Sequence, residues 1–182
     1  MRLASRHMPK FLRRPLGFPA WLLLACVAAG LAYLALVDLK AFLAVLGVFA
    51  ALLCLAGIEY RRDAQKLRAL ASLREGQTIC EFARDFETRA VDTWVVRAVY
   101  EQIQGQLNHA APSFPVRADD RLKEDLRLDD DDLDLDLAHE ISMRTGRPMG
   151  SFVLNPYFGR VKTVRDLVHF FQNQPLSARQ LP

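Results

Sequence analysis

Hydrophobic and polar positions divide the chain into two long apolar runs and a longer stretch in which apolar residues recur at helical spacing. The runs cover residues 18–37 and 41–58 and contain no charged residue. As helices they would extend roughly 27 to 30 Å, the thickness of a bilayer's hydrocarbon core. Only residues 38–40 separate them, so we expect a tight transmembrane hairpin. Because neither run carries an ionisable group, the hairpin is expected to be an anchor.

Basic residues flank both apolar runs. They are Arg2, Arg6, Lys10, Arg13 and Arg14 before the first run, and Arg61, Arg62, Lys66 and Arg68 after the second. Basic flanks stay on the cytoplasmic side, so both termini are expected in the cytoplasm, with residues 1–17 as a basic cytoplasmic segment of an inner-membrane, multi-pass protein. A cleaved signal peptide is the competing interpretation, but the first apolar run is too long for one.

The rest of the chain has the pattern of short amphipathic helices, so the expected fold class is all-α. The pattern over residues 59–91 predicts a juxtamembrane helical linker. Its first part is basic, and a helix over residues 79–90 follows, which begins at the capping-box pair Thr78 and Glu81. Asp92 or Thr93 can cap the next helix, and Thr163 with Asp166 opens the last one. Residues 173–182 are expected to form a tail.

Acidic residues concentrate between Asp119 and Asp136. This segment has ten of them against Arg121, Lys123 and Arg127, a net charge of −7 in a chain whose total is +3. Residues 133–137 alternate with period two, as in a strand, but the segment is too short to outweigh the helical pattern. A calcium loop starting at Asp129 or at Asp132 breaks the required ligand pattern, so no metal is expected.

A family resemblance rests on short motifs within residues 92–172. The sequence R-L-K-E-D-L at residues 121–126, the Leu and Asp residues at 128–132, P-Y-F at 156–158 and T-V-R-D-L at 163–167 resemble parts of the four-helix acyl carrier protein fold. The segment is most similar to an uncharacterised bacterial family of acyl-carrier-like proteins. The resemblance implies a small cytoplasmic four-helix bundle and a bacterial inner membrane.

The resemblance also implies a serine that bears phosphopantetheine at the start of the second helix, and here the sequence departs from the family. Aligning Glu124-Asp125-Leu126 puts Asp130 at that position, and aligning Asp-x-Leu puts Asp132 there. A carboxylate offers no hydroxyl for the phosphodiester, so no cofactor is expected. Ser142 and Ser151 are the nearest serines downstream, and neither has the expected context.

In carriers of this type the acidic second helix docks on basic partner enzymes. By resemblance, the candidate partner-binding residues are Asp129, Asp131, Asp134, Asp136 and Glu140. We therefore expect a non-enzymatic, membrane-tethered module that docks a basic protein or membrane complex, with no nucleic-acid partner. The alternatives are a carrier modified at an unconventional serine, and a membrane-hairpin assembly protein with a regulatory soluble domain.

No catalytic residues are predicted. The four histidines lack metal-ligand spacing, and His139 and Glu140 would point in different directions on a helix. Cys26, Cys54 and Cys80 have no paired spacing and are expected to be free thiols.

Overall fold

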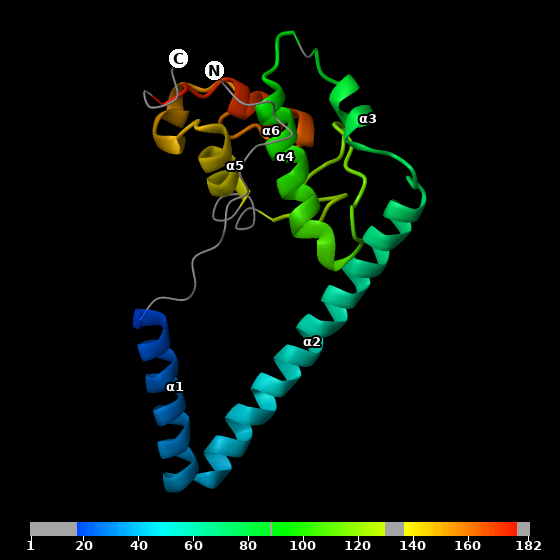
Figure 1. The fold of residues 1–182 in the computed structure, drawn as a ribbon. Helices are drawn as coiled ribbons and strands as arrows, with labels where there is room; N and C mark the ends of the chain where they lie inside the picture. The colour runs from blue at the N-terminus through cyan, green and yellow to red at the C-terminus, as the bar shows by residue number, and fades with distance from the viewer. Residues whose placement is uncertain (1–17, 88, 130–136, 178–182) are drawn as a thin grey trace. The chain divides into compact units, whose positions relative to one another are not determined.

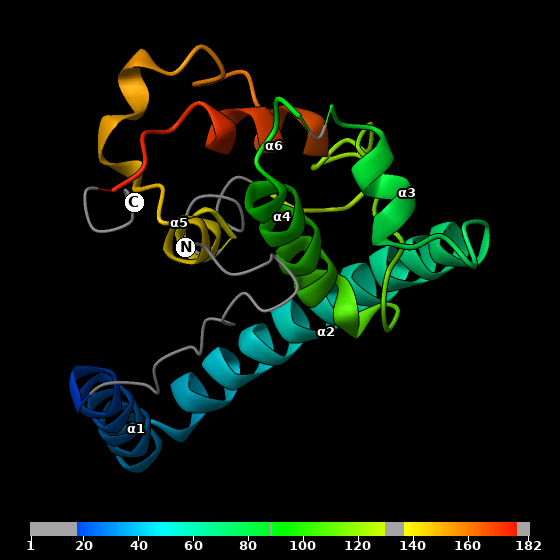
Figure 2. The ribbon, with the colours of Figure 1, turned by 45° about the horizontal axis from the view of Figure 1, so that its top comes forward.

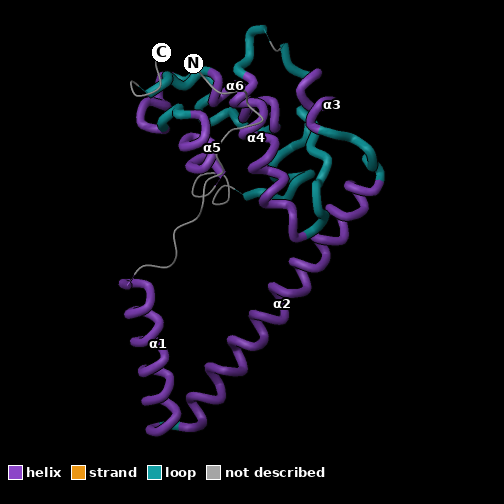
Figure 3. The backbone as a smooth tube through the Cα atoms, viewed as in Figure 1, coloured by secondary structure: helices purple, strands orange, loops and turns teal. Residues whose placement is uncertain are grey.

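The structure is a computed structural model that describes residues 18–87, 89–129 and 137–177. In these residues the regular elements are all helices, and the extended pairing found is a single bridge between Arg121 and Thr163 (Figure 3). The predicted all-α class is therefore confirmed, whereas the carrier-type bundle stays a prediction. The described residues divide into two compact units, one ending at Arg62 and the other beginning at Asp63.

The first unit contains α1 (Phe18–Val37) and the apolar part of α2 (Leu39–Ser72). Both helices are long and apolar enough to cross a membrane, and their apolar windows bury no side chain. Asp38 separates them, and its Oδ1 accepts hydrogen bonds from the backbone N–H groups of Lys40 and Ala41 at 3.0 and 3.1 Å. This cap starts α2 two residues before the predicted second span.

The helix α2 continues past its apolar segment to Ser72, and its last part belongs to the second unit (Figure 1). There Ala64 and Leu67 are 5% and 2% exposed and join the core. The basic segment after the second apolar run therefore extends the helix.

The segment predicted to be a linker contributes further core residues. The helix α3 (Ile79–Arg84) starts at the predicted capping box, in which Thr78 and Glu81 satisfy each other's backbone N–H groups. It ends at Arg84, shorter than the predicted 79–90, because the backbone turns so that the Phe86 N–H donates to the Ala83 carbonyl. Phe82 and Phe86 are buried with ring centroids 5.1 Å apart.

The helix α4 (Thr93–Gln106) lies at the centre of the second unit and packs against α3, α5 (Ala138–Thr145) and α6 (Val164–Gln172). Two views show α3 and α5 on opposite sides of α4 (Figures 1 and 2). Asp92 caps α4, since its Oδ1 accepts from the Trp94 N–H at 2.9 Å. The predicted capping box at Thr163 and Asp166 opens α6. Short 3-10 helices, η2 (Leu107–His109) and η4 (Met149–Leu154), complete the unit.

The start of the acidic helix differs from the prediction. Leu128 and Asp129 were expected to open it, but neither is helical, and the next described helix, α5, has Leu137 at its N-cap. Two features prevent a helix at Leu128: the preceding Arg127 has a φ of 57°, and the Leu128 N–H donates to the Leu122 carbonyl at 2.9 Å. The helix α5 ends at Gly146, whose φ of 67° suits glycine.

The three cysteines are free, as the sequence predicts, and all three are exposed.

Candidate functional site

The candidate site is residues 129–136, the last part of the acidic region, which is called the acidic segment from here on, and the structure describes the residues on both sides of it. On one side Leu126 and Leu128 are 0% and 5% exposed, and Asp129 is exposed. On the other side Leu137 and Ile141 are 1% and 0% exposed. Both ends of the segment are therefore anchored in the same core by buried leucine and isoleucine.

The five predicted docking residues are only partly described. Asp129 follows the buried Leu128, and Glu140 is half-buried in the first turn of α5. Asp131, Asp134 and Asp136 lie outside the described residues, as do Asp130 and Asp132, the two positions equivalent to the carrier's serine. Asp129 and Glu140 thus belong to the surface of one domain.

The loop that leads into the acidic segment is held by local hydrogen bonds. Asp125 Oδ2 accepts from the Arg121 N–H at 2.8 Å, and the Arg121 carbonyl accepts from the N–H groups of Asp125 and Leu126 at 3.1 Å. The Leu122 N–H donates to the Lys162 carbonyl at 2.9 Å, which ties the loop to the residues before α6. The E-D-L motif therefore has a structural role as a closed turn.

The same loop contacts α2. Arg127 Nε lies 3.5 Å from Asp63 Oδ1, and Lys66 Nζ lies 3.7 Å from the same atom. Both pairs are partly exposed, so each contributes at most about 1 kcal/mol. The Lys66 pair lies within α2, whereas the Arg127 pair joins the loop before Asp129 to α2 at Asp63.

Ser142 lies inside α5 and is half-buried, and its carbonyl accepts from the N–H groups of Gly146 and Arg147. This differs from the exposed helix start where a carrier presents its serine. Ser151 lies in η4, where its side chain is outside the described set.

A network of charged residues joins α4 and α5. Glu101 binds Arg97 at 3.0 Å within α4 and also binds Arg144 of α5. Burial alone would raise the pKa of Glu101, but the hydrogen bonds from Arg144 and Arg97 outweigh it, so the pKa lies below its ordinary value. This network orients α5, which carries Glu140.

A second polar cluster joins the ends of three helices. Arg147 donates to the carbonyls of Gln172 and Gln174 at 2.9 and 2.5 Å and lies 3.5 Å from Asp92 Oδ2. The Gln172 side chain accepts from the Asp92 N–H at 3.0 Å. Arg147 is 7% exposed, so these bonds satisfy a charge that would otherwise be costly to bury.

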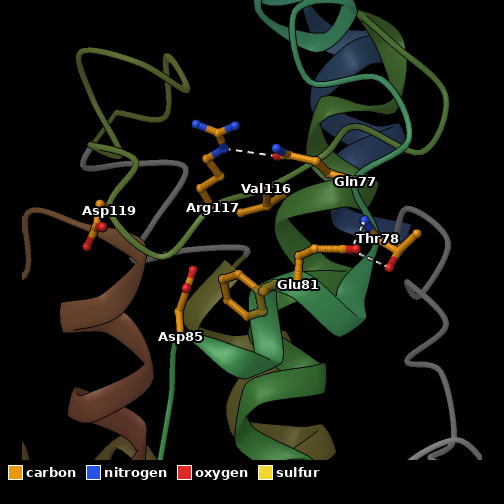
Figure 4. A pocket seen from close by; sticks show the side chains of 8 residues that line it. Gln77, Thr78, Glu81, Asp85, Val116, Arg117 and Asp119 are labelled. Atoms are coloured by element: carbon orange, nitrogen blue, oxygen red, sulfur yellow. Dashed lines mark hydrogen bonds between the residues drawn. The ribbon is translucent and has the colours of Figure 1, made fainter.

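Two open clefts accompany these networks. One, of about 310 Å³, lies between α3 and residues 116–119, where Arg117 Nε donates to Gln77 Oε1 at 2.9 Å (Figure 4). Thr78 lowers the pKa of Glu81 in this cleft through its side-chain and backbone hydrogen bonds. The other, of about 390 Å³, is lined by Glu101 and Arg144 together with carboxamide side chains of α4. The carboxylates of both clefts are largely occupied by bonds that hold the fold.

Sequence reasoning missed the ion pairs that hold the domain together. Two ion pairs, Arg74–Asp120 and Glu101–Arg144, each link residues that are far apart in the chain, so no local sequence pattern indicates them. The one available signal is the position of Arg144, which falls on the same helical face as the buried Ile141.

Comparisons of this chain with protein-family models, with curated proteins and with solved structures found no match.

Proposed function

We propose that this protein is a non-enzymatic interaction module of the bacterial inner membrane, in which a helical hairpin anchors a small cytoplasmic domain that docks a basic partner. The docking residues would be Asp129, Asp131, Asp134, Asp136 and Glu140. No prosthetic group takes part in this proposal, because aspartate stands at both candidate positions of the carrier's serine.

The observation that carries the proposal is the anchoring of the acidic segment. Buried residues on both sides, Leu128 and Leu137, hold its two ends against the core, and Asp129 is exposed directly after the first. Carboxylates repel one another, so a run of them costs stability and is retained where it serves a surface role. An acidic surface raises the association rate of a basic partner and selects against acidic ones, nucleic acids among them.

The charge distribution supports the same proposal. From Asp63 onward the chain has 19 acidic and 16 basic residues, whereas the residues before Asp63 include two acidic and eight basic ones. The basic flanks favour a cytoplasmic location for both termini. A basic partner would then be drawn to the domain and also to the anionic lipid surface beside it.

The membrane tether supports a recruiting role. The helix α2 runs from the apolar segment into the core of the domain, with Leu67 buried, so no loop separates the two. A module held beside the bilayer raises the local concentration of whatever it binds.

The test is a comparison of partner recovery between two charge-matched variants. The first replaces Asp129, Asp131 and Asp134 with Asn, and the second replaces the exposed Glu75 and Glu87 with Gln and the exposed Asp85 with Asn. Proteins that co-purify with the full-length chain from solubilised membranes are quantified by mass spectrometry at low and high salt. We expect the first variant alone to lose basic proteins, by roughly tenfold at low salt and less at high salt. Equal recovery by the first variant and the unmodified chain would contradict the proposal.

A further inference from the structure

Two large apolar side chains of the second unit, four residues apart in the chain, are exposed. Leu154 is 92% exposed at the end of η4, and Phe158 is 50% exposed four residues later. Among the described residues of this unit, Leu73 and Met143 are the other large apolar side chains with comparable exposure. Exposed apolar side chains of this size are candidates for a contact surface when they lie on one turn.

The turn that carries Leu154 and Phe158 is fixed by contacts with the core of the domain. Asn155, between them, is 7% exposed, and its Nδ2 donates to the Phe170 carbonyl at 2.8 Å. Its Oδ1 accepts from the Tyr157 N–H, and its carbonyl accepts from the Phe158 N–H, both at 3.0 Å. The Tyr157 ring also stacks on His169 of α6, with ring centroids 5.6 Å apart. The two apolar groups are therefore presented on a pre-formed turn, which lowers the entropic cost of binding.

Basic side chains are exposed at the end of this turn. Arg160 and Lys162 are exposed directly after Phe158, and the next acidic residue, Asp166, uses its Oδ2 to accept from the backbone N–H groups of Lys162 and Thr163 at 3.1 and 2.9 Å. Gly159, with a φ of 67°, reverses the chain between Phe158 and Arg160. The surface formed by Leu154, Phe158, Arg160 and Lys162 is called the apolar–basic turn below.

Leu154 and Phe158 lie towards the end of the domain away from the entry of α2. Arg68 Nε of α2 donates to the Ala110 carbonyl, just after the C-terminal end of α4. In contrast, Asn155 binds the C-terminal half of α6, which meets the N-terminus of α4 through Gln172 and Asp92. The turn and the last part of α2 therefore lie at different ends of α4. Exposed basic side chains beside exposed apolar ones complement an acidic and partly apolar segment of a protein partner.

We propose that the apolar–basic turn binds an acidic segment of a protein partner in which carboxylates alternate with apolar side chains. Leu154 and Phe158 would contact the apolar side chains, and Arg160 and Lys162 would pair with the carboxylates. This surface is separate from the acidic docking surface and takes the opposite charge, so the domain would connect two partners of different chemistry.

The experiment uses the full-length protein in nanodiscs of zwitterionic lipid and a fluorescently labelled peptide of alternating leucine and glutamate. Binding is measured by fluorescence anisotropy. Two comparison peptides have lysine in place of glutamate, or serine in place of leucine. We expect the leucine–glutamate peptide alone to bind, and its affinity to fall as salt is raised.

Two variants with matched controls test the residues. Replacing Leu154 and Phe158 with Ser should weaken binding about tenfold or more, because exposed anchors contribute most of the affinity of small interfaces. Replacing Arg160 and Lys162 with Gln should remove the salt dependence while leaving the turn folded. The controls, Leu73→Ser and Arg84→Gln, change an exposed leucine and an exposed arginine elsewhere and should bind as the unmodified chain does.

Three outcomes would overturn the proposal. The first is failure of the leucine–glutamate peptide to bind, or equal binding of the lysine peptide. The second is hydrogen-exchange protection of residues 154–162 on addition of anionic lipid alone, which would assign the turn to the membrane surface. The third is loss of self-association in the Leu154 and Phe158 variant, which would assign it to a second copy. Since partner recovery through Asp129 is measured separately, either proposal can fail without the other.

Discussion

Arg74 binds Asp120 through both of its terminal nitrogens, at 2.8 Å from Nη1 to Oδ2 and 2.6 Å from Nη2 to Oδ1. The side chains are 11% and 4% exposed, and Asp120 Oδ2 also accepts from the Arg117 N–H at 2.8 Å. The Asp120 carbonyl accepts from the Val164 N–H at the start of α6. This one carboxylate residue therefore joins the segment after α2, the loop before the acidic run and the last helix.

Replacing Arg74 with Met should destabilise the second unit by about 3 kcal/mol, because it leaves the Asp120 carboxylate buried without its cation. Arg74→Lys should recover part of this loss but not all, since lysine cannot form the paired geometry. Urea unfolding of the full-length protein in micelles, followed by near-ultraviolet circular dichroism, measures both. Equal stability of the Met variant and the unmodified chain would show that Asp120 is stabilised by other groups.

Phe82→Ala should cost about 3 to 4 kcal/mol, since Phe82 is 2% exposed and lies 5.1 Å, between ring centroids, from both Phe86 and Tyr100. The control is Leu73→Ala, at an 83% exposed position, where a change below about 0.5 kcal/mol is expected. If both variants unfold at the same urea concentration, residues 79–87 are a linker and not part of the core.

Arg127 occupies the left-handed region with a φ of 57°, which disfavours residues with a Cβ. Arg127→Gly and Arg127→Ala both remove the contact with Asp63, so they differ only in the backbone at this position. We expect the Gly variant to be more stable than the Ala variant by about 1 kcal/mol in the same unfolding measurement. The reverse order would mean that the loop before Asp129 relaxes to another conformation.

The stability of the second unit should fall in acid partly through Glu101. Its pKa is lower in the folded state than its ordinary value, since burial is outweighed by the hydrogen bonds from Arg144 and Arg97. The stabilisation is therefore complete above the ordinary pKa of about 4.3 and is lost as the pH falls through the lower folded value. The difference in unfolding free energy between the unmodified chain and Glu101→Gln should be constant near neutral pH and shrink below about pH 4. A difference that stays constant down to pH 3 would contradict this role.

The features that sequence predicted well are local ones. Three capping signals lie within three residues of the helix starts that they mark, namely Thr78 with Glu81, Asp92 alone, and Thr163 with Asp166. Their spacing alone located α3, α4 and α6. The two long apolar helices were equally evident, because their length and composition need no partner in the fold.

The features that sequence did not predict depend on distant residues. The backbone of Leu128 is held by Leu122, which is itself bound to Lys162, and this keeps Leu128 and Asp129 out of the helix expected to begin there. The burial of Ala64 and Leu67 was not predicted, because the basic residues around them indicated only the flank of a membrane span. Of the candidate site, Asp129 and Glu140 could be placed, whereas the network that positions α5 joins Glu101 to Arg144 across 43 positions.

The burial of Ala64 and Leu67 sets an order of assembly. Because the chain is made from its N-terminus, the end of α2 leaves the ribosome before the rest of the core that packs on it. The domain can therefore complete its core only around a helix that has already been made. A recombinant fragment that starts at Asp92 would lack this part of the core, so a fragment meant to fold without the hairpin should begin no later than Asp63.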